Sequence, residues 1–192
     1  MSYTAPKRIT ITGDPGSGKS TFARNVAGFA GFELITTGNM FREIAAKYGV
    51  SVTDLNKMAE TQAEIDYEVD NYLQSLNNTD KNLVIDSRMA WHFVHNTLKI
   101  RLTVTPEIAV KRIFEDENAA SLRERFGSIE EAMREVNARR DSEVRRYYDL
   151  YGVDISDTHN FDLVLDTSYK APEAVIEEFK QAFAAHFDVA GA

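Results

Sequence analysis

The sequence predicts an α/β fold in which helices cover both faces of a central parallel sheet of about five strands. Short apolar runs recur along the chain with helical segments between them, as in strand–helix–strand units with right-handed crossovers. Each run also ends in a polar or glycine-bearing turn, which is typical of buried strands in one parallel sheet. A chain of 192 residues can form one well-packed core, so we expect a single domain over residues 1–192 arranged as a three-layer sandwich.

The expected strands and their connecting helices can be placed individually. The five apolar runs are 9–12, 33–36, 83–86, 100–104 and 162–166. The segment Thr105-Pro106-Glu107 predicts a helix start, because proline is favoured at the first helical position after a hydroxyl residue. A last helix is expected at about 172–187, with Val175, Phe179 and Phe183 on its buried face.

Two connections are longer than a crossover requires, and we expect each to be an insertion in the same domain. The first, 38–81, has apolar residues at helical spacing: Ile65, Val69, Tyr72, Leu73 and Leu76. The second, about 116–159, contains the capping box Ser128-Ile129-Glu130-Glu131 before a long charged helix. That helix could be a solvated element with ion pairs along its surface. In a phosphate-handling enzyme, its arginines are also candidates for a closing lid.

Composition excludes several classes of protein. The chain has 30 acidic and 22 basic residues and a formal charge of −8, so its field would repel a nucleic-acid backbone. It has no cysteine, which excludes disulfides and thiolate metal sites and fits a reducing cytoplasm. No stretch approaches about 18 consecutive apolar residues. We therefore expect a soluble, cytoplasmic protein that binds neither nucleic acid nor a membrane. Composition implies no particular protein partner.

A glycine-rich motif follows the first expected strand and precedes a helical pattern. It is Gly13-Asp14-Pro15-Gly16-Ser17-Gly18-Lys19-Ser20-Thr21, which matches G-x-x-x-x-G-K-[ST]. Glycines let backbone N–H groups approach a phosphate, and the helix N-terminus adds positive charge. Lys19 can reach the β- and γ-oxygens, while the Ser20 hydroxyl can ligate Mg²⁺. The motif predicts ATP and Mg²⁺ as ligands, bound by Gly13, Gly16, Ser17, Gly18, Lys19, Ser20 and Thr21.

The third run ends in Asp86, followed by Ser87 and Arg88. An acid at the carboxyl end of a strand beside a P-loop can hold Mg²⁺ directly or through water. Taken alone, such an aspartate could equally start a turn. With the P-loop in the same chain, we expect Asp86 and Ser20 to share the metal site.

Beyond the P-loop, Thr37-Gly38-Asn39-Met40-Phe41-Arg42 and Asp86-Ser87-Arg88 resemble the nucleoside monophosphate kinases, most of all the compact cytidylate kinase group. The resemblance covers almost the whole chain. It includes Ala63-Glu64-Ile65-Asp66, residues 148–154 and Asp166-Thr167-Ser168. It implies a P-loop NTPase fold whose two insertions bind the monophosphate acceptor (38–81) and close as a lid (about 116–159), with small-molecule nucleotides as the partners of the protein.

The resemblance also implies roles for individual residues. Thr37, Arg42 and Arg88 would bind the acceptor phosphate. The lid motif of the family is matched imperfectly by Arg139-Arg140-Asp141-Ser142-Glu143-Val144-Arg145, where the second arginine falls one place late. Arg139 and Arg145 would act in catalysis together with Lys19 and Arg88.

The resemblance implies cytosine as the acceptor base. Its N4 amino group needs a carboxylate or carbonyl and its N3 needs a donor, and Asp66, Arg88 and Asp141 supply these types. Uracil reverses the pattern, so CMP or dCMP should be preferred over UMP. AMP is the second candidate.

Two other functions remain open at this stage, and a third is disfavoured. A kinase of another small metabolite could share the P-loop core and place arginines for an acidic acceptor. A non-catalytic nucleotide-binding protein could retain the motif without turnover. A GTP-dependent switch is disfavoured, because Asn56-Lys57-Met58-Ala59 lacks the acid of the guanine-reading Asn-Lys-x-Asp motif.

Overall fold

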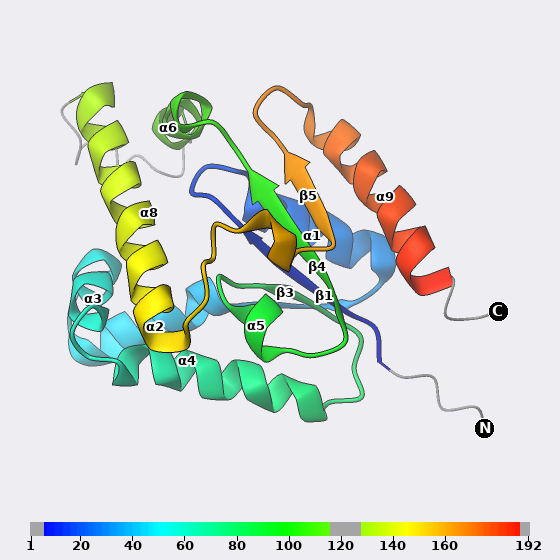
Figure 1. Ribbon diagram of the computed structural model, residues 1–192, viewed down its shortest axis with the longest axis horizontal. Coiled ribbons are helices and arrows are strands. Elements are labelled where there is room, and N and C mark those ends of the chain that lie inside the picture. The colour runs from blue at the N-terminus through cyan, green and yellow to red at the C-terminus, as the bar shows by residue number, and fades with distance from the viewer. Residues whose placement is uncertain (1–5, 116–127, 189–192) are drawn as a thin grey trace.

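The computed structural model describes residues 6–115 and 128–188, and a five-stranded parallel sheet lies at its centre (Figure 1). The strand order is β2-β3-β1-β4-β5. The strands are β1 (Arg8–Gly13), β2 (Glu33–Thr36), β3 (Leu83–Asp86), β4 (Thr97–Thr103) and β5 (Leu163–Asp166). The predicted fold class and all five predicted strands are confirmed. Strand β4 starts earlier than expected because Thr97 and the residues after it pair with β1 from Arg8 onward.

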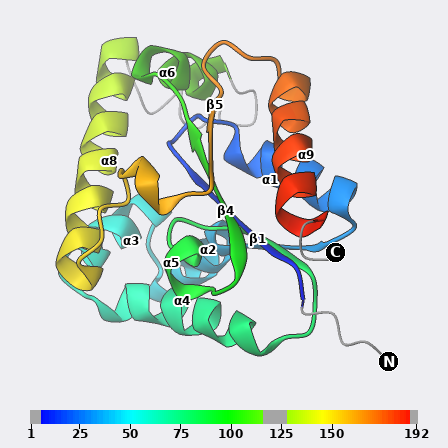
Figure 2. The same cartoon turned by 45° about the vertical axis from the view of Figure 1, so that its right-hand side comes forward.

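Helices cover both faces of this sheet (Figures 1 and 2). Helix α1 (Lys19–Ala30) and helix α9 (Pro172–Asp188) share one core with inward side chains of β1, β4 and β5. Helix α4 (Glu64–Ser75) and the short α5 (Ala90–Phe93) share the other core with β3. Strand β3 shows the alternation that separates the layers, since Val84 belongs to the first core while Leu83 and Ile85 belong to the second.

The first long connection folds into α2 (Thr37–Tyr48), α3 (Val52–Ala59), α4 and a 3₁₀ turn, η1 (Leu76–Asn78). The apolar spacing predicted a helix here, and Ile65, Val69 and Leu73 of α4 are indeed buried. The Ser51 hydroxyl accepts a hydrogen bond from the Asp54 N–H and so caps α3.

The second long connection contributes α8 (Ile129–Tyr151), which follows α6 (Pro106–Glu115) with residues 116–127 outside the described ranges. The Ser128 hydroxyl accepts from the Glu131 N–H at 3.1 Å, as the capping box predicted. Helix α8 stands beside α3 in both views (Figures 1 and 2). Its Val144 and Tyr147 pack into the core formed by α2, α3 and α4. A 3₁₀ turn, η3 (Thr158–Asn160), leads into β5.

The connections place the functional end of the sheet. From β1 the chain passes to β2 on one side, whereas β4 pairs with β1 on the other. In open parallel sheets, ligands bind at the carboxyl ends of the strands where the direction of winding reverses. That position is the end of β1, where the P-loop begins. No helix within the described ranges is both long and apolar enough to cross a membrane.

Candidate active site

The loop between β1 and α1 is built as a phosphate-binding turn. Gly16 and Gly18 adopt φ values of +75° and +79°, which residues with a Cβ rarely adopt. A Cβ on Gly13 would lie 2.7 Å from the Leu102 carbonyl oxygen, and one on Gly16 would lie 2.7 Å from the Ala109 carbonyl oxygen. Backbone conformation therefore favours glycine at positions 16 and 18. Close packing requires glycine at positions 13 and 16. The loop leads directly into the N-terminus of α1, which favours anions.

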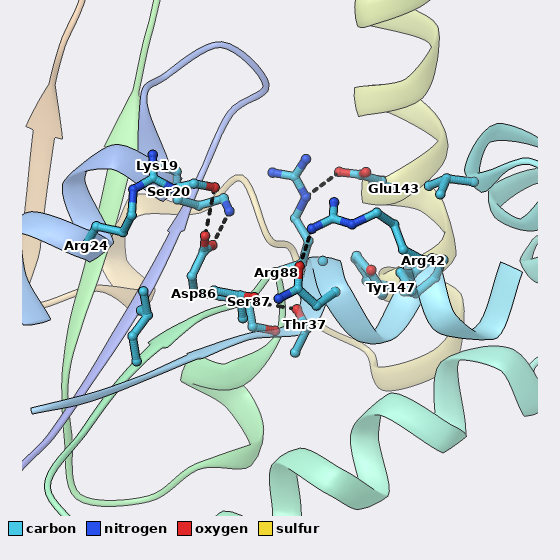
Figure 3. A pocket seen from close by; sticks show the side chains of 16 residues that line it. Lys19, Ser20, Arg24, Thr37, Arg42, Asp86, Ser87, Arg88, Glu143 and Tyr147 are labelled. Atoms are coloured by element: carbon cyan, nitrogen blue, oxygen red, sulfur yellow. Dashed lines mark hydrogen bonds and ion pairs between the residues drawn. The ribbon is translucent and has the colours of Figure 1, made fainter. Parts of the chain in front are cut away.

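Lys19 and Ser20 converge on Asp86 at the end of β3 (Figure 3). The Lys19 ammonium forms an ion pair with Asp86, and the Ser20 hydroxyl donates to the other carboxylate oxygen at 2.9 Å. Burial lowers the pKa of Lys19 from its usual value, although Asp86 acts in the opposite direction. The three residues that the sequence assigned to phosphate and metal binding thus meet in one place.

Arg112 of α6 stabilises the phosphate loop through the turn after β5, a role that the sequence analysis missed. Its guanidinium donates to the Thr167 hydroxyl at 3.1 Å and to the Thr167 carbonyl at 2.5 Å. The Thr167 hydroxyl lies 3.1 Å from the Ser17 carbonyl oxygen. The turn after β5 therefore supports the phosphate loop through a partly buried hydrogen-bond network.

A cavity of about 520 Å³ opens beside Lys19 and Asp86 (Figure 3). Its volume lies within the range of small-molecule sites. The wall comes from α1, β2, α2, α3, the end of β3 and α8. Its polar side chains are Lys19, Ser20, Arg24, Thr36, Thr37, Asn39, Arg42, Asp86, Ser87, Arg88, Glu143 and Tyr147. Four arginine or lysine side chains in one cavity favour a ligand with negative charge.

Arg88 is held across this cavity by Glu143 of α8 (Figure 3). The Arg88 Nε lies 3.0 Å from a Glu143 carboxylate oxygen, and the Glu143 side chain is only 8% exposed. Arg88 also donates to the Gly13 carbonyl of the P-loop. A single guanidinium therefore joins the phosphate loop, the β3 end and the long helix of the second insertion.

Thr37 and Arg42 line the same cavity from α2. Thr37 is buried and its hydroxyl lies 3.4 Å from the Asp86 carbonyl oxygen. Arg42 is exposed and donates to the side chain of Asn39, one turn earlier on α2. The structure thus brings together Thr37, Arg42 and Arg88, the three residues assigned to the acceptor phosphate.

Asp66 lies behind the cavity wall rather than in it. Its carboxylate oxygen is 3.2 Å from the Arg146 Nε, and the two side chains are 3% and 6% exposed. Burial raises the pKa of Asp66, with Arg146 opposing that shift. On the same helix, Asp70 accepts from the Tyr151 hydroxyl. These contacts join α4 to α8, so the first long connection and the long helix are linked by buried polar groups.

Two of the remaining predicted lid residues, Asp141 and Arg145, are not among the described residues that line the cavity. Asp141 and Arg145 are exposed on α8. The side chain of Arg139 lies outside the described residues. Their assigned roles stay predictions.

Glu143 and Tyr147 are site residues that sequence reasoning missed. A signal existed, because Val144, Tyr147 and Tyr151 form an apolar stripe at helical spacing on an otherwise charged helix. Glu143 is adjacent to that stripe and one turn before Tyr147, so it had to face inward.

The fold and the site together define a P-loop kinase: a glycine-rich phosphate loop after β1, a lysine at the start of α1, an acid at the end of the adjacent strand β3, and arginines around a cavity. The model of the "Cytidylate kinase-like family" matches residues 8–169. The chain belongs to this family.

Relatives of similar length support the same assignment. The cytidylate kinase of Methanothrix thermoacetophila is 39% identical over 159 residues, which cover 83% of this chain and 87% of the relative. That of Pyrobaculum islandicum is 40% identical, with 84% of each chain covered. That of Pyrococcus abyssi is 37% identical, with 91% of this chain and 92% of the relative covered.

Solved structures share the fold at low sequence identity. The shikimate kinase of Bacteroides thetaiotaomicron superposes with a TM-score of 0.62 at 16% identity, covering 92% of this chain and 98% of that one. A gluconokinase from Sinorhizobium meliloti gives a TM-score of 0.61 at 10% identity, covering 94% and 93%. At these identities the likeness concerns the fold alone.

Proposed function

We propose that this protein transfers the γ-phosphoryl group of ATP to CMP or dCMP, giving ADP and CDP or dCDP. The observation that carries the proposal is the cavity of about 520 Å³ that begins at Lys19 and Asp86 and continues to Arg42 and Arg88. A donor phosphate at the P-loop and an acceptor phosphate at the arginines would face each other across it. Such an arrangement supplies the in-line positioning that phosphoryl transfer requires.

On the donor side, the P-loop N–H groups and Lys19 neutralise the β- and γ-phosphates. In the structure Lys19 is paired with Asp86, so the phosphates must compete for it. Once Lys19 follows the charge of the transferred group, it stabilises the transition state more than the bound substrate, and this difference accelerates the reaction.

The residues around Asp86 fit a magnesium ion. One buried carboxylate and one hydroxyl lie 2.9 Å apart at the mouth of the phosphate loop. Mg²⁺ is commonly held by one or two protein oxygens, with waters and substrate phosphates completing its shell. Asp86 and Ser20 would hold the ion, and its charge would neutralise the donor phosphates.

The metal assignment can be tested by replacing Asp86 with Asn. We expect the Mg²⁺ concentration for half-maximal rate to rise by about tenfold, since the ion loses its charged protein ligand. The matched control is Asp149→Asn, because Asp149 is an exposed aspartate of α8 that is not among the residues lining the cavity. An unchanged Mg²⁺ titration for Asp86→Asn would contradict the assignment.

On the acceptor side, Arg88 and Arg42 bind the monophosphate. Arginine forks suit a phosphate because they donate two parallel hydrogen bonds. Glu143 pairs with the Nε of Arg88, so the other donors of this guanidinium can bind the acceptor phosphate while the contact with α8 is kept. We propose that 38–81 is the acceptor-binding insertion and that the second insertion is the lid whose closure excludes water.

The most specific part of the proposal is the selection of cytosine over other bases. Glu143 gives the cavity a buried carboxylate that can accept from the N4 amino group of cytosine. Uracil would present an acceptor to the same carboxylate, and a buried mismatch of this kind is strongly disfavoured. Asp66 would act indirectly, by fixing Arg146 and through it the position of α8.

The decisive experiment measures ADP release with ATP and Mg²⁺ and each of CMP, dCMP, UMP, AMP and GMP. We expect kcat/KM for CMP or dCMP to exceed that for UMP by at least about 10²-fold. Shikimate and gluconate are included as non-nucleotide acceptors, because the fold is shared with their kinases. A higher kcat/KM for AMP than for CMP would overturn the cytidylate proposal while leaving a P-loop kinase.

A further inference from the structure

Asp14 places a negative charge inside the loop that must bind phosphates. Its N–H donates to the Leu102 carbonyl at 3.1 Å, and its own carbonyl accepts from the Ser17 N–H at 3.1 Å. The side chain is only 11% exposed. An uncompensated carboxylate so close to a polyphosphate site would repel the donor phosphates. Its burial would also cost free energy, because the charge would lose its hydration. The structure must therefore neutralise it.

Arg101 of β4 provides a rigid partner. Its Nη2 lies 3.0 Å from the Asp14 Oδ1, and its Nη1 donates to the Ile155 carbonyl at 2.7 Å. The guanidinium also lies over the Phe161 ring, 5.7 Å from its centroid, and is 5% exposed. Because these contacts come from three segments, they fix the orientation of the guanidinium and with it that of the Asp14 carboxylate.

Arg140 of α8 is the second, adjustable partner of the same carboxylate oxygen. Its Nε lies 3.9 Å from the Asp14 Oδ1, and its side chain is 41% exposed, against 5% for Arg101. Asp14 therefore holds one guanidinium rigidly and attracts another that has room to move. A small cavity of about 20 Å³, enough for one water, is lined by Asp14, Arg101, Arg140 and Glu143 among others.

We propose that Asp14 is a positioning residue: fixed by Arg101, it holds Arg140 of the lid helix beside the phosphate loop, where that guanidinium meets the charge of the transferred phosphoryl group. Asp14 is part of the loop that binds the donor, so a side chain that it attracts lies close to the donor phosphates. The inference rests on the proposed kinase activity and adds Arg140 to the lid arginines expected from the sequence. A preplaced guanidinium favours transfer because it need not reorganise during the reaction.

A double-mutant cycle tests this coupling. Asp14→Asn keeps the size of the side chain and an oxygen for Arg101, but removes the charge that attracts Arg140. We expect kcat to fall about tenfold with the KM values for ATP and CMP within about twofold of wild type. Arg140→Ala should lower kcat by about 10²-fold. The double variant should be no slower than Arg140→Ala alone, because both changes remove one contact.

Controls separate positioning from general stability. Arg134→Ala removes another exposed arginine of α8, and its kcat should equal that of the wild type. The thermal unfolding midpoint of Asp14→Asn is measured under the assay conditions. Wild-type turnover by Asp14→Asn, losses that multiply in the double variant, or a rate loss that only follows the unfolded fraction would each overturn the proposal.

A second measurement does not depend on activity. The chain has no cysteine, so Asn25→Cys on α1 and Ala138→Cys on α8 can be labelled specifically with spin labels, and both positions are exposed. Asp14→Asn should broaden the distribution of distances between the labels, since α8 loses a tether to the phosphate loop. An unchanged distribution would overturn the inference. If the wild-type protein phosphorylated no monophosphate, the proposed function would fail, while this distance measurement would still decide the role of Asp14.

Discussion

The donor half and the acceptor half of the site both pair a cation with an acid, but they are assembled differently. In the donor half, Lys19 and Ser20 come from one nine-residue motif and meet a carboxylate on a strand next to β1. In the acceptor half, α8 brings Glu143 to Arg88 and Arg146 to Asp66, from elements far apart in the sequence. The donor half is therefore preformed by local backbone geometry, whereas the acceptor half depends on where one helix packs. Mutations should affect chemistry in the first half and geometry or stability in the second.

The largest effect is expected for Lys19→Met. The side chain lies at the phosphate loop and would follow the transferred charge, so kcat should fall by at least about 10²–10³-fold. Steady-state ADP release measures the loss, and far-ultraviolet circular dichroism checks that the fold is kept. The control Lys57→Met changes an exposed lysine of α3 and should leave kcat unchanged. Near-normal turnover by Lys19→Met would contradict the donor assignment.

The acceptor half should respond to Arg146→Met chiefly through stability. The change leaves Asp66, 3% exposed, without its ion-pair partner, and breaking such a pair costs about 3–5 kcal/mol in the free energy of unfolding. Urea denaturation measures this difference. The matched control is Lys47→Met, which breaks an ion pair between α2 and α4 whose side chains are 66% and 48% exposed. It should cost no more than about 1 kcal/mol. Equal costs for both variants would contradict the structural role of the buried pair.

Arg88→Ala sharpens the comparison because Arg88 touches both halves. We expect the KM for the acceptor to rise between about tenfold and about 10²-fold, as for a lost hydrogen bond to a charged group. The KM for ATP should rise less, since Lys19 and the P-loop N–H groups remain and the phosphate loop loses only the Arg88 contact at the Gly13 carbonyl. Arg42→Ala should raise the acceptor KM less, because Arg42 is exposed. If Arg88→Ala raised both KM values equally, its assignment to the acceptor phosphate would be wrong.

The smallest effect concerns the pH dependence of the contact between α4 and α8. Burial raises the pKa of Asp70 to about 6, although its hydrogen bond from Tyr151 acts the other way. The folded state therefore retains the proton more strongly than the unfolded chain. The stability that Asp70 contributes is fully present below its unfolded pKa of about 4 and is lost as the pH rises through 6. Unfolding in urea from pH 4.5 to pH 7.5 should show this decrease in the wild type and a flatter profile for Asp70→Asn. Identical profiles would contradict the prediction.

The sequence by itself determined the sheet and the phosphate loop. Five apolar runs became the five strands, and the P-loop pattern placed Lys19 and Ser20 at the start of α1. The strands and the phosphate loop are both local features of the chain. Strand burial follows from the short-range hydrophobic pattern, and Gly16 and Gly18 adopt positive φ values within the motif itself. Asp86 was also predictable, because parallel strands end at the same edge of their sheet.

Only the tertiary structure decided which charged residues of the insertions face the site. Asp66 and Asp141 looked equally suited to a base pocket, yet Asp66 is buried against Arg146 and Asp141 is exposed. The apolar stripe of α8 indicates an inward face for Glu143 and Tyr147, but it does not identify their partners. Those partners, like the role of Arg112, depend on the docking of α6 and α8. Asp14 could not be assigned from the loop pattern either, since its partners Arg101 and Arg140 are distant in sequence. Long-range ion pairs have no fixed spacing along the chain, so only the packing of the helices against the sheet selects them.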